Sequence, residues 1–279
     1  MEKRFGGKIG FAASPLSRDI KSTADFAREH HFDFVQLSLD FSRLFPENLK
    51  ESKRREIREY YNNRNIGLYF HGPSDIPLMN RHDAVREAGL NRIFEMIDLA
   101  VELGGVYFIF HPGRLAFYST GKNKVVFMEN RIPSKHLDFF RDSLYKILEY
   151  ASGRVSVCIE NTHYMPLGFL DIINETLRDR GLHLVWDVGY TDILPPDKRA
   201  RMLKFYNDNV GYVKIVHLHN ITDSGGHKTL RTGMVNVPAY IDIINAIRAD
   251  VVLEIFPEKS LLESVKYLNS LAADLKTMS

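Results

Sequence analysis

This 279-residue chain predicts an α/β protein with a single (β/α)8 TIM-barrel domain spanning residues 1–279. Two observations lead to this fold class. Eight short runs rich in Val, Ile, Phe or Tyr recur along the chain, and each suits a buried parallel strand better than a helix. Amphipathic stretches with apolar residues at three- and four-residue spacing alternate with these runs. The length also suits a barrel of about 250 residues with insertions.

The expected strands and helices alternate strictly. Helical patterns are clearest over 85–105, which stops at a pair of glycines, and over 136–151 and 260–275. A doubly wound open sheet is the alternative, but it normally has fewer strands and often a Gly-rich first turn, and "FAASPLSRD" (11–19) lacks G-x-G-x-x-G. The strands are predicted at 8–13, 32–39, 66–71, 106–111, 155–160, 182–187, 213–219 and 251–256.

The longest irregular stretch, 112–134, directly follows the fourth expected strand. A loop of this length in a compact domain is usually functional and often a lid, the alternative being a plain surface insertion. Its basic residues would suit the rim of a phosphate site or simply lie in solvent, and we favour the latter. They are Arg114, Lys122, Lys124 and Arg131.

The composition is that of an ordinary globular protein, with 44% hydrophobic and 26% charged residues. A net charge of +2 does not require a polyanionic partner. The single cysteine, Cys158, excludes an intrachain disulfide and a cysteine-rich zinc module, and it suits a reducing cytosol. No apolar run approaches the roughly 20 residues of a membrane span, and the N-terminus lacks a secretory signal. We therefore expect a cytoplasmic protein with no membrane partner, while the oligomeric state is left open.

Six of the expected strands carry a His, Asp or Glu at or near their C-terminal end. Strand C-termini meet at one face of a (β/α)8 barrel, where the active sites of this fold lie, so these side chains should converge. Carboxylates brought together there would repel one another, and a divalent cation is the natural neutraliser. The sequence thus predicts a metal site built from His71, His111, Glu160, Asp187, His217 and Glu254.

The seventh strand ends in two histidines, His217 and His219, which share a face because strand side chains alternate with a period of two. His219 lies about 6–7 Å further along the strand, too far to join the same ligand shell. We expect His217 to bind the metal and His219 to face the substrate or to contact a metal ligand. His163, just after Glu160, is likewise expected to face the substrate or to contact a metal ligand. Five other histidines are interpreted as structural: His30, His31, His82, His136 and His183.

With these residues placed, the chain resembles the xylose isomerase-like TIM-barrel superfamily, which includes sugar isomerases, sugar epimerases and endonuclease IV. Each matching piece is short, but their order and spacing over most of the chain make the resemblance specific. The pieces are "FHG", "FHPG", "IEN", "WDVGY", "VHLHN", "HKTLRTG" and "LEIF".

The epimerase branch of this superfamily implies a metal-dependent isomerase or epimerase acting on a sugar or sugar phosphate. In that branch one divalent ion is held by four residues that match Glu160, Asp187, His217 and Glu254. Glu160 and Glu254 would also move the substrate proton through an enediolate. The resemblance implies Mn²⁺, Zn²⁺, Mg²⁺ or Co²⁺ as cofactor, one ion or at most two. Candidate substrate-binding residues are His71, His111, His163, Tyr190, His219, His227 and Arg231.

Endonuclease IV implies a second function, phosphodiester cleavage at abasic DNA. Members of that branch bind three zinc ions, and His71 and His111 match ligands of the second. The third zinc needs a D-x-x-H histidine and a D-x-H pair, but Tyr190 and Gly225 occupy two of these positions and only His227 remains. A nucleic-acid partner is therefore disfavoured. A catalytically silent metal-binding or partner-binding relative is the third alternative.

Two positions also depart from the epimerase pattern. Tyr190 replaces a substrate-binding histidine, and Asp223 stands where an arginine usually follows the metal-binding histidine. Arg231 is a candidate to take over the role of that arginine. The resemblance therefore implies a carbohydrate substrate that differs from the free ketohexoses.

Overall fold

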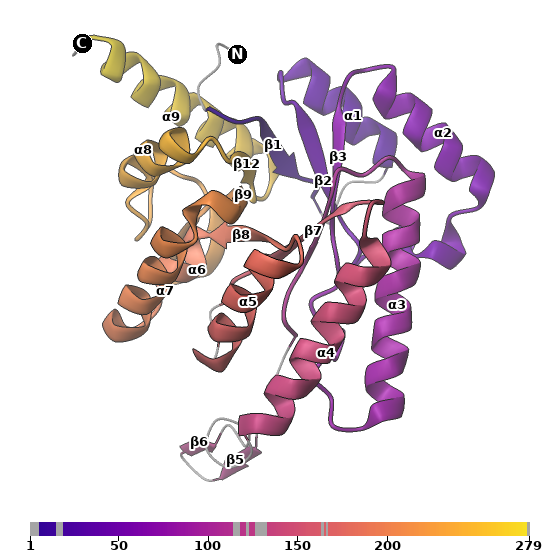
Figure 1. Cartoon of the computed structure of the whole chain (residues 1–279). Helices are drawn as coiled ribbons and strands as arrows, with labels where there is room; N and C mark the ends of the chain where they lie inside the picture. The colour runs from indigo at the N-terminus through magenta and orange to yellow at the C-terminus, as the bar shows by residue number, and fades with distance from the viewer. Residues whose placement is uncertain are drawn as a thin grey trace.

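The structure is a closed barrel of eight parallel strands with helices around it (Figure 1). It is a computed structural model that describes residues 6–14, 19–113, 118–120, 123–125, 133–162, 165 and 167–277. The strands pair around the barrel in the order β1-β12-β9-β8-β7-β4-β3-β2. Their bounds are β1 (Ile9–Ala12), β2 (Phe34–Ser38), β3 (Gly67–His71), β4 (Tyr107–Phe110), β7 (Ser156–Glu160), β8 (His183–Asp187), β9 (Val213–Leu218) and β12 (Asp250–Leu253).

All eight predicted strands are present, so the predicted (β/α)8 TIM barrel is confirmed. The open doubly wound sheet is excluded because the eight strands form a closed ring, in which the first strand, β1, pairs with the last, β12, as well as with β2. The largest difference in bounds is at the last strand, predicted over 251–256 but observed over Asp250–Leu253. Leu253 makes the last ladder pair with β1, opposite Phe11. Glu254 therefore lies just past the strand, although it is still buried.

Helices connect the strands and surround the barrel. The stretches predicted at 85–105, 136–151 and 260–275 correspond to α3, α4 and α9. Helix α3 stops before Gly104, which has φ of +79°, a left-handed conformation that favours glycine at a helix end. The bounds are α1 (Ile20–Glu29), α2 (Glu51–Asn62), α3 (Asp83–Glu102), α4 (Pro133–Ala151), α5 (Leu167–Asp179), α6 (Val188–Asp192), α7 (Pro196–Asp208), α8 (Val237–Ile247) and α9 (Glu258–Thr277), with short 3-10 turns η1 (Ser42–Leu44), η2 (Pro46–Asn48) and η3 (Val210–Tyr212).

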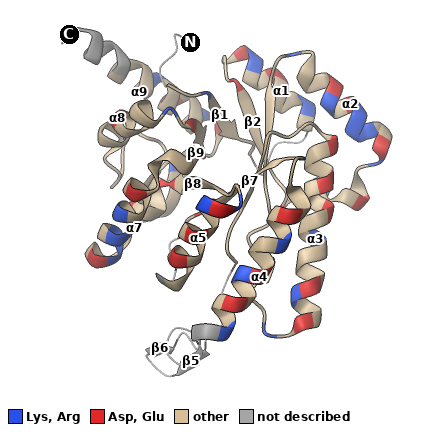
Figure 2. Cartoon of the chain, viewed as in Figure 1, with Lys and Arg blue, Asp and Glu red and all other residues tan. Residues whose placement is uncertain are grey.

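Charged side chains are concentrated on the helices, such as α2, α3, α4 and α7, while the barrel strands carry few (Figure 2). This distribution is expected because each helix packs one face on the barrel and turns the other to water. Among the described helices, none is long and apolar enough to span a membrane.

Two short hairpins extend from loops after barrel strands. One consists of β5 (Tyr118–Thr120) and β6 (Asn123–Val125), within the predicted long loop 112–134. Most of that loop, with Arg114, Lys122, Arg131 and the side chain of Lys124, lies outside the described residues, so its role as a lid stays a prediction.

The other hairpin follows β9 and pairs β10 (Asn220–Thr222) with β11 (Gly225–Lys228). The sequence pattern does not predict it, because "NIT" and "GGHK" show no alternation of apolar and polar residues.

The inside of the barrel holds a compact apolar layer, which we call the apolar floor. Within it, the rings of Phe34 and Tyr69 stack with centroids 3.9 Å apart. The Tyr69 hydroxyl donates to Asp250, at the N-terminal end of β12, so this layer fills the barrel from its N-terminal side. The floor contains one residue from each barrel strand: Ala12, Phe34, Tyr69, Ile109, Cys158, Val185, Ile215 and Val252.

Candidate metal centre

A layer of polar side chains lies directly above the apolar floor, towards the C-terminal ends of the strands. One face of a strand presents every second residue, so the residue two positions after each floor residue again faces the barrel interior. After β1 this residue is Ser14. After the other seven floor residues it is Gln36, His71, His111, Glu160, Asp187, His217 and Glu254.

Four of these residues form a compact cluster, in which one ligand atom of each lies within 4.8 Å of those of the others. The cluster consists of Glu160, Asp187, His217 and Glu254. All four are buried, with exposed fractions from 0% for Asp187 and His217 to 9% for Glu254. Three carboxylates packed so closely away from water destabilise a fold unless a counter-charge compensates them. One imidazole nitrogen and three carboxylate oxygens form a donor set that suits a divalent cation.

The ring of His217 lies between the two glutamates of the cluster. Its Nδ1 is 3.1 Å from Oε1 of Glu160 and 3.3 Å from Oε1 of Glu254. This nitrogen is buried, yet neither contact has the alignment of a hydrogen bond. Buried polar atoms are normally hydrogen-bonded, so an unaligned ring nitrogen facing two carboxylates has the arrangement of a metal ligand. The residues present therefore fit a divalent ion.

The charges of the cluster shift the pKa values of its members. Burial opposes a charged imidazole, but the carboxylates of Glu160 and Glu254 outweigh it and raise the pKa of His217 to about 9. Burial opposes the charged form of Glu160 too, but His217 and His111 outweigh it and hold the pKa of this carboxyl well below its usual value. The two carboxylates thus favour a proton on the His217 ring, and a cation that binds there would have to displace it.

A second group of potential ligands shares Glu160 with the first and adds His71 and His111. Oε2 of Glu160 is 3.0 Å from Nε2 of His71 and 3.1 Å from Nε2 of His111, whereas its Oε1 faces His217. Burial opposes a charged His71, but the hydrogen bond with Glu160 outweighs it and raises the pKa of this histidine. Glu160 therefore joins the two groups, and the second could hold another ion.

His219 lies behind the cluster and is fully buried. Its Nε2 donates to Oδ2 of Asp187 at 3.1 Å, and the backbone N–H of His227 donates to its Nδ1 at 3.1 Å. Gly189 leaves room for the ring, because a Cβ there would lie 2.3 Å from His219 Cε1. The contacts of the two histidines therefore differ: His217 faces the two glutamates, whereas His219 is hydrogen-bonded to Asp187. Their roles toward a metal and a substrate stay predictions.

The other predicted residues lie at varying distances from this cluster. The Tyr190 ring is edge-on to His219 and His227, with centroids 5.8 Å and 6.5 Å away. His227 has its Nδ1 3.0 Å from the backbone oxygen of Glu254 and a partly exposed ring. Arg231 is exposed in the turn after β11. His163 lies outside the described residues.

Two buried amides that sequence reasoning missed hold cluster residues in place. Gln36 on β2 donates from Nε2 to Oε1 of Glu254 at 2.7 Å and accepts a hydrogen bond from Nε2 of His217 at 3.0 Å. Asn161 accepts from the Asp187 N–H at 2.8 Å and donates to the Asp187 carbonyl at 3.0 Å. Both residues could have been noticed in the sequence. Gln36 is a polar residue in the middle of a mostly apolar strand, and Asn161 directly follows Glu160.

Solved structures with the same fold include three that cover nearly the whole chain. A D-tagatose 3-epimerase-like protein has a TM-score of 0.74 and 18% identity, covering 97% of this chain and 99% of that one. The 3-keto-D-glucoside 4-epimerase from E. coli has a TM-score of 0.70 and 16% identity, with 95% and 99% covered. A Thermus thermophilus protein, soaked with ZnCl2, has a TM-score of 0.70 and 21% identity, with 96% and 98% covered. At these identities the likeness shows the fold.

No curated protein matches the sequence. The family model described as xylose isomerase-like TIM barrel matches residues 24–271, which include all four residues of the buried cluster. The chain therefore belongs to the xylose isomerase-like TIM-barrel family.

Proposed function

We propose that this protein is a divalent-metal-dependent isomerase or epimerase that acts on a small sugar or sugar phosphate. The observation that carries the proposal is the pair of buried glutamates, Glu160 and Glu254, that flank His217 Nδ1 at 3.1 Å and 3.3 Å. Together with Asp187, these residues would hold one ion. Mn²⁺, Zn²⁺, Mg²⁺ or Co²⁺ would there polarise the carbonyl and adjacent hydroxyl of the substrate.

The two glutamates are suited to move a proton at the substrate carbon. Burial opposes their charged forms, but the His217 charge outweighs it and lowers the pKa of both carboxyls, so both are ionised at neutral pH. An ionised carboxylate beside a carbon acid can remove its proton. Because Glu160 and Glu254 approach from different strands, one would take the proton from one face of the substrate and the other would return a proton to the opposite face.

The substrate class is supported by the names of similar structures, which include a 3-keto-D-glucoside 4-epimerase and an L-ribulose 3-epimerase. Tyr190, His227 and Arg231 would complete the sugar site, with Tyr190 and Asp223 at positions where ketohexose enzymes carry a histidine and an arginine. We therefore propose a substrate other than the free ketohexoses.

Metal analysis tests the proposal directly. Protein purified without chelator is expected to contain about one of these four ions per chain. Chelation should lower the melting temperature, and the ion at about 100 times its Kd should restore about 2.7 kcal/mol of stability, or about 5 °C. KCl at equal ionic strength serves as the control and should have no such effect. Protein without bound metal, whose melting temperature none of the four ions changes, would contradict the proposal.

A second candidate function, cleavage of abasic DNA, is favoured by the His71–His111–Glu160 group alone. With Tyr190 and Gly225 at positions of third-zinc ligands, we expect little or no cleavage of a duplex containing an abasic site in the presence of Zn²⁺. The measurement is the rate of strand scission beside that of an authentic repair nuclease. A rate within about tenfold of that enzyme, a barrier difference of only ~1.4 kcal/mol, would reverse the ranking of the two functions.

A further inference from the structure

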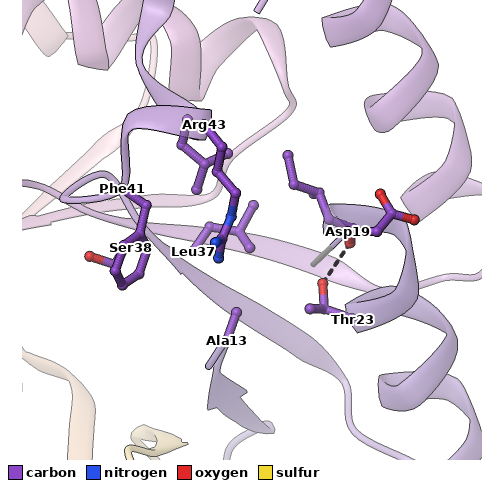
Figure 3. A pocket seen from close by; sticks show the side chains of 9 residues that line it. Ala13, Asp19, Thr23, Leu37, Ser38, Phe41 and Arg43 are labelled. Carbon is purple, nitrogen blue, oxygen red and sulfur yellow. Dashed lines mark hydrogen bonds between the residues drawn. The ribbon is translucent and has the colours of Figure 1, made fainter. Parts of the chain in front are cut away.

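Gln36 lies at the centre of β2, between Phe34 of the apolar floor and Ser38 on the same face of the strand. In the barrel ladder it stands between Ala12 of β1 and Tyr69 of β3, both members of the apolar floor. The next residue, Leu37, faces the other way, into a small pocket outside the barrel that Arg43 also lines (Figure 3). Gln36 therefore points into the barrel by strand geometry, and only 2% of it is exposed.

A buried primary amide is costly in this environment unless both of its ends are hydrogen-bonded. Here both ends are used by residues of the cluster. Nε2 donates to Glu254 Oε1 at 2.7 Å, and Oε1 accepts from the Nε2–H of His217 at 3.0 Å. A carboxylate can only accept and the amide oxygen can only accept, so this arrangement fixes both the orientation of the amide and a proton on His217 Nε2.

The proton on Nε2 decides which ring nitrogen of His217 is free to bind an ion. The hydrogen bond made by one nitrogen of a ligand histidine sets the tautomer and leaves the lone pair on the other. In His217 that other nitrogen is Nδ1, the atom that faces Glu160 and Glu254. The same amide holds Glu254 by its Oε1, so a single side chain orients two of the four cluster residues.

We propose that Gln36 is a positioning residue of the metal centre, which selects the metal-binding tautomer of His217 and fixes the carboxylate of Glu254 beside it. This inference rests on the proposed function, since it assumes that the cluster binds an ion. Gln36 is not one of the four cluster residues, and it acts through its hydrogen bonds with His217 and Glu254.

The test is Gln36→Leu, which removes both hydrogen bonds with little change in volume, with Gln36→Met as a second variant. Metal-free protein is titrated with Mn²⁺ and with Co²⁺ by calorimetry, and the visible absorption of bound Co²⁺ is recorded. We expect about 10- to 100-fold weaker affinity and a changed Co²⁺ spectrum. Tyr69→Phe is the matched control, because it removes a partly buried hydrogen bond at the other end of the barrel. It should lose stability but keep wild-type affinity and spectrum.

The outcomes separate this inference from the proposed function. If the wild type binds neither ion, the proposed function fails and the role of Gln36 fails with it. If the wild type binds and a folded Gln36 variant binds within threefold with an unchanged Co²⁺ spectrum, only the Gln36 inference is wrong. If circular dichroism shows that both Gln36 variants are unfolded, the residue is structural and the inference is equally wrong.

Discussion

Glu160→Gln and Glu254→Gln are each expected to lower epimerisation by roughly 10²- to 10⁴-fold at saturating metal, the range typical of a removed acid–base group. An amide occupies nearly the volume of the carboxylate but cannot accept the substrate proton. Because each glutamate would serve one face of the substrate, a single variant should still exchange the substrate hydrogen with solvent while failing to invert the carbon.

The measurement is proton NMR in D₂O with free and phosphorylated ketopentoses, ketohexoses and keto-glycosides. It records loss of the C–H signal and formation of the epimer separately. Glu149→Gln, an exposed glutamate on α4, is the matched control and should behave as wild type. If both site variants keep more than a tenth of wild-type epimerisation with metal bound, the assignment of the bases is wrong.

His217→Ala and His219→Ala are expected to separate the ligand from the residue that supports it. His217→Ala removes a proposed metal donor and the largest counter-charge of both Glu160 and Glu254. The ion should no longer stabilise this variant, and the metal-free form should lose about 3 kcal/mol, as when one partner of a buried ion pair is removed. His219→Ala removes the hydrogen bond to Asp187 and the acceptor of the His227 N–H, but none of the four cluster residues, so it should still bind the ion about 10- to 100-fold more weakly.

Melting temperature with and without added metal, together with metal content per chain, measures both variants. His136→Ala, in α4, changes a buried histidine away from the cluster and controls for loss of packing alone. Metal-dependent stabilisation that survives in His217→Ala but disappears in His219→Ala would mean that the two assignments must be exchanged.

The barrel was predictable because its signals are local. A run of apolar residues predicts a strand such as β9. The period of two then predicts that a potential ligand near the strand end, such as His217, faces the barrel interior. The sequence offers no local sign of which polar groups pair, however. Gln36 and Glu254 are 218 positions apart, and only the closure of the barrel makes them neighbours. The hydrogen-bond partners of Asn161 and Gln36 are therefore defined only by the three-dimensional structure.

We expect the closure of the barrel to govern when in folding the chain can bind an ion. β12 completes the ring by pairing with β1, and Glu254 directly follows this strand. A chain that lacks this last strand has an open edge next to β1. Because Glu254 is then not in place, the proposed metal site has only three of its four residues. Closing so long a loop is a slow step that costs chain entropy. Binding of the ion can stabilise the chain only after the barrel has closed. Metal uptake should therefore be a late event in folding, and an ion at this site marks a chain whose first and last strands have met.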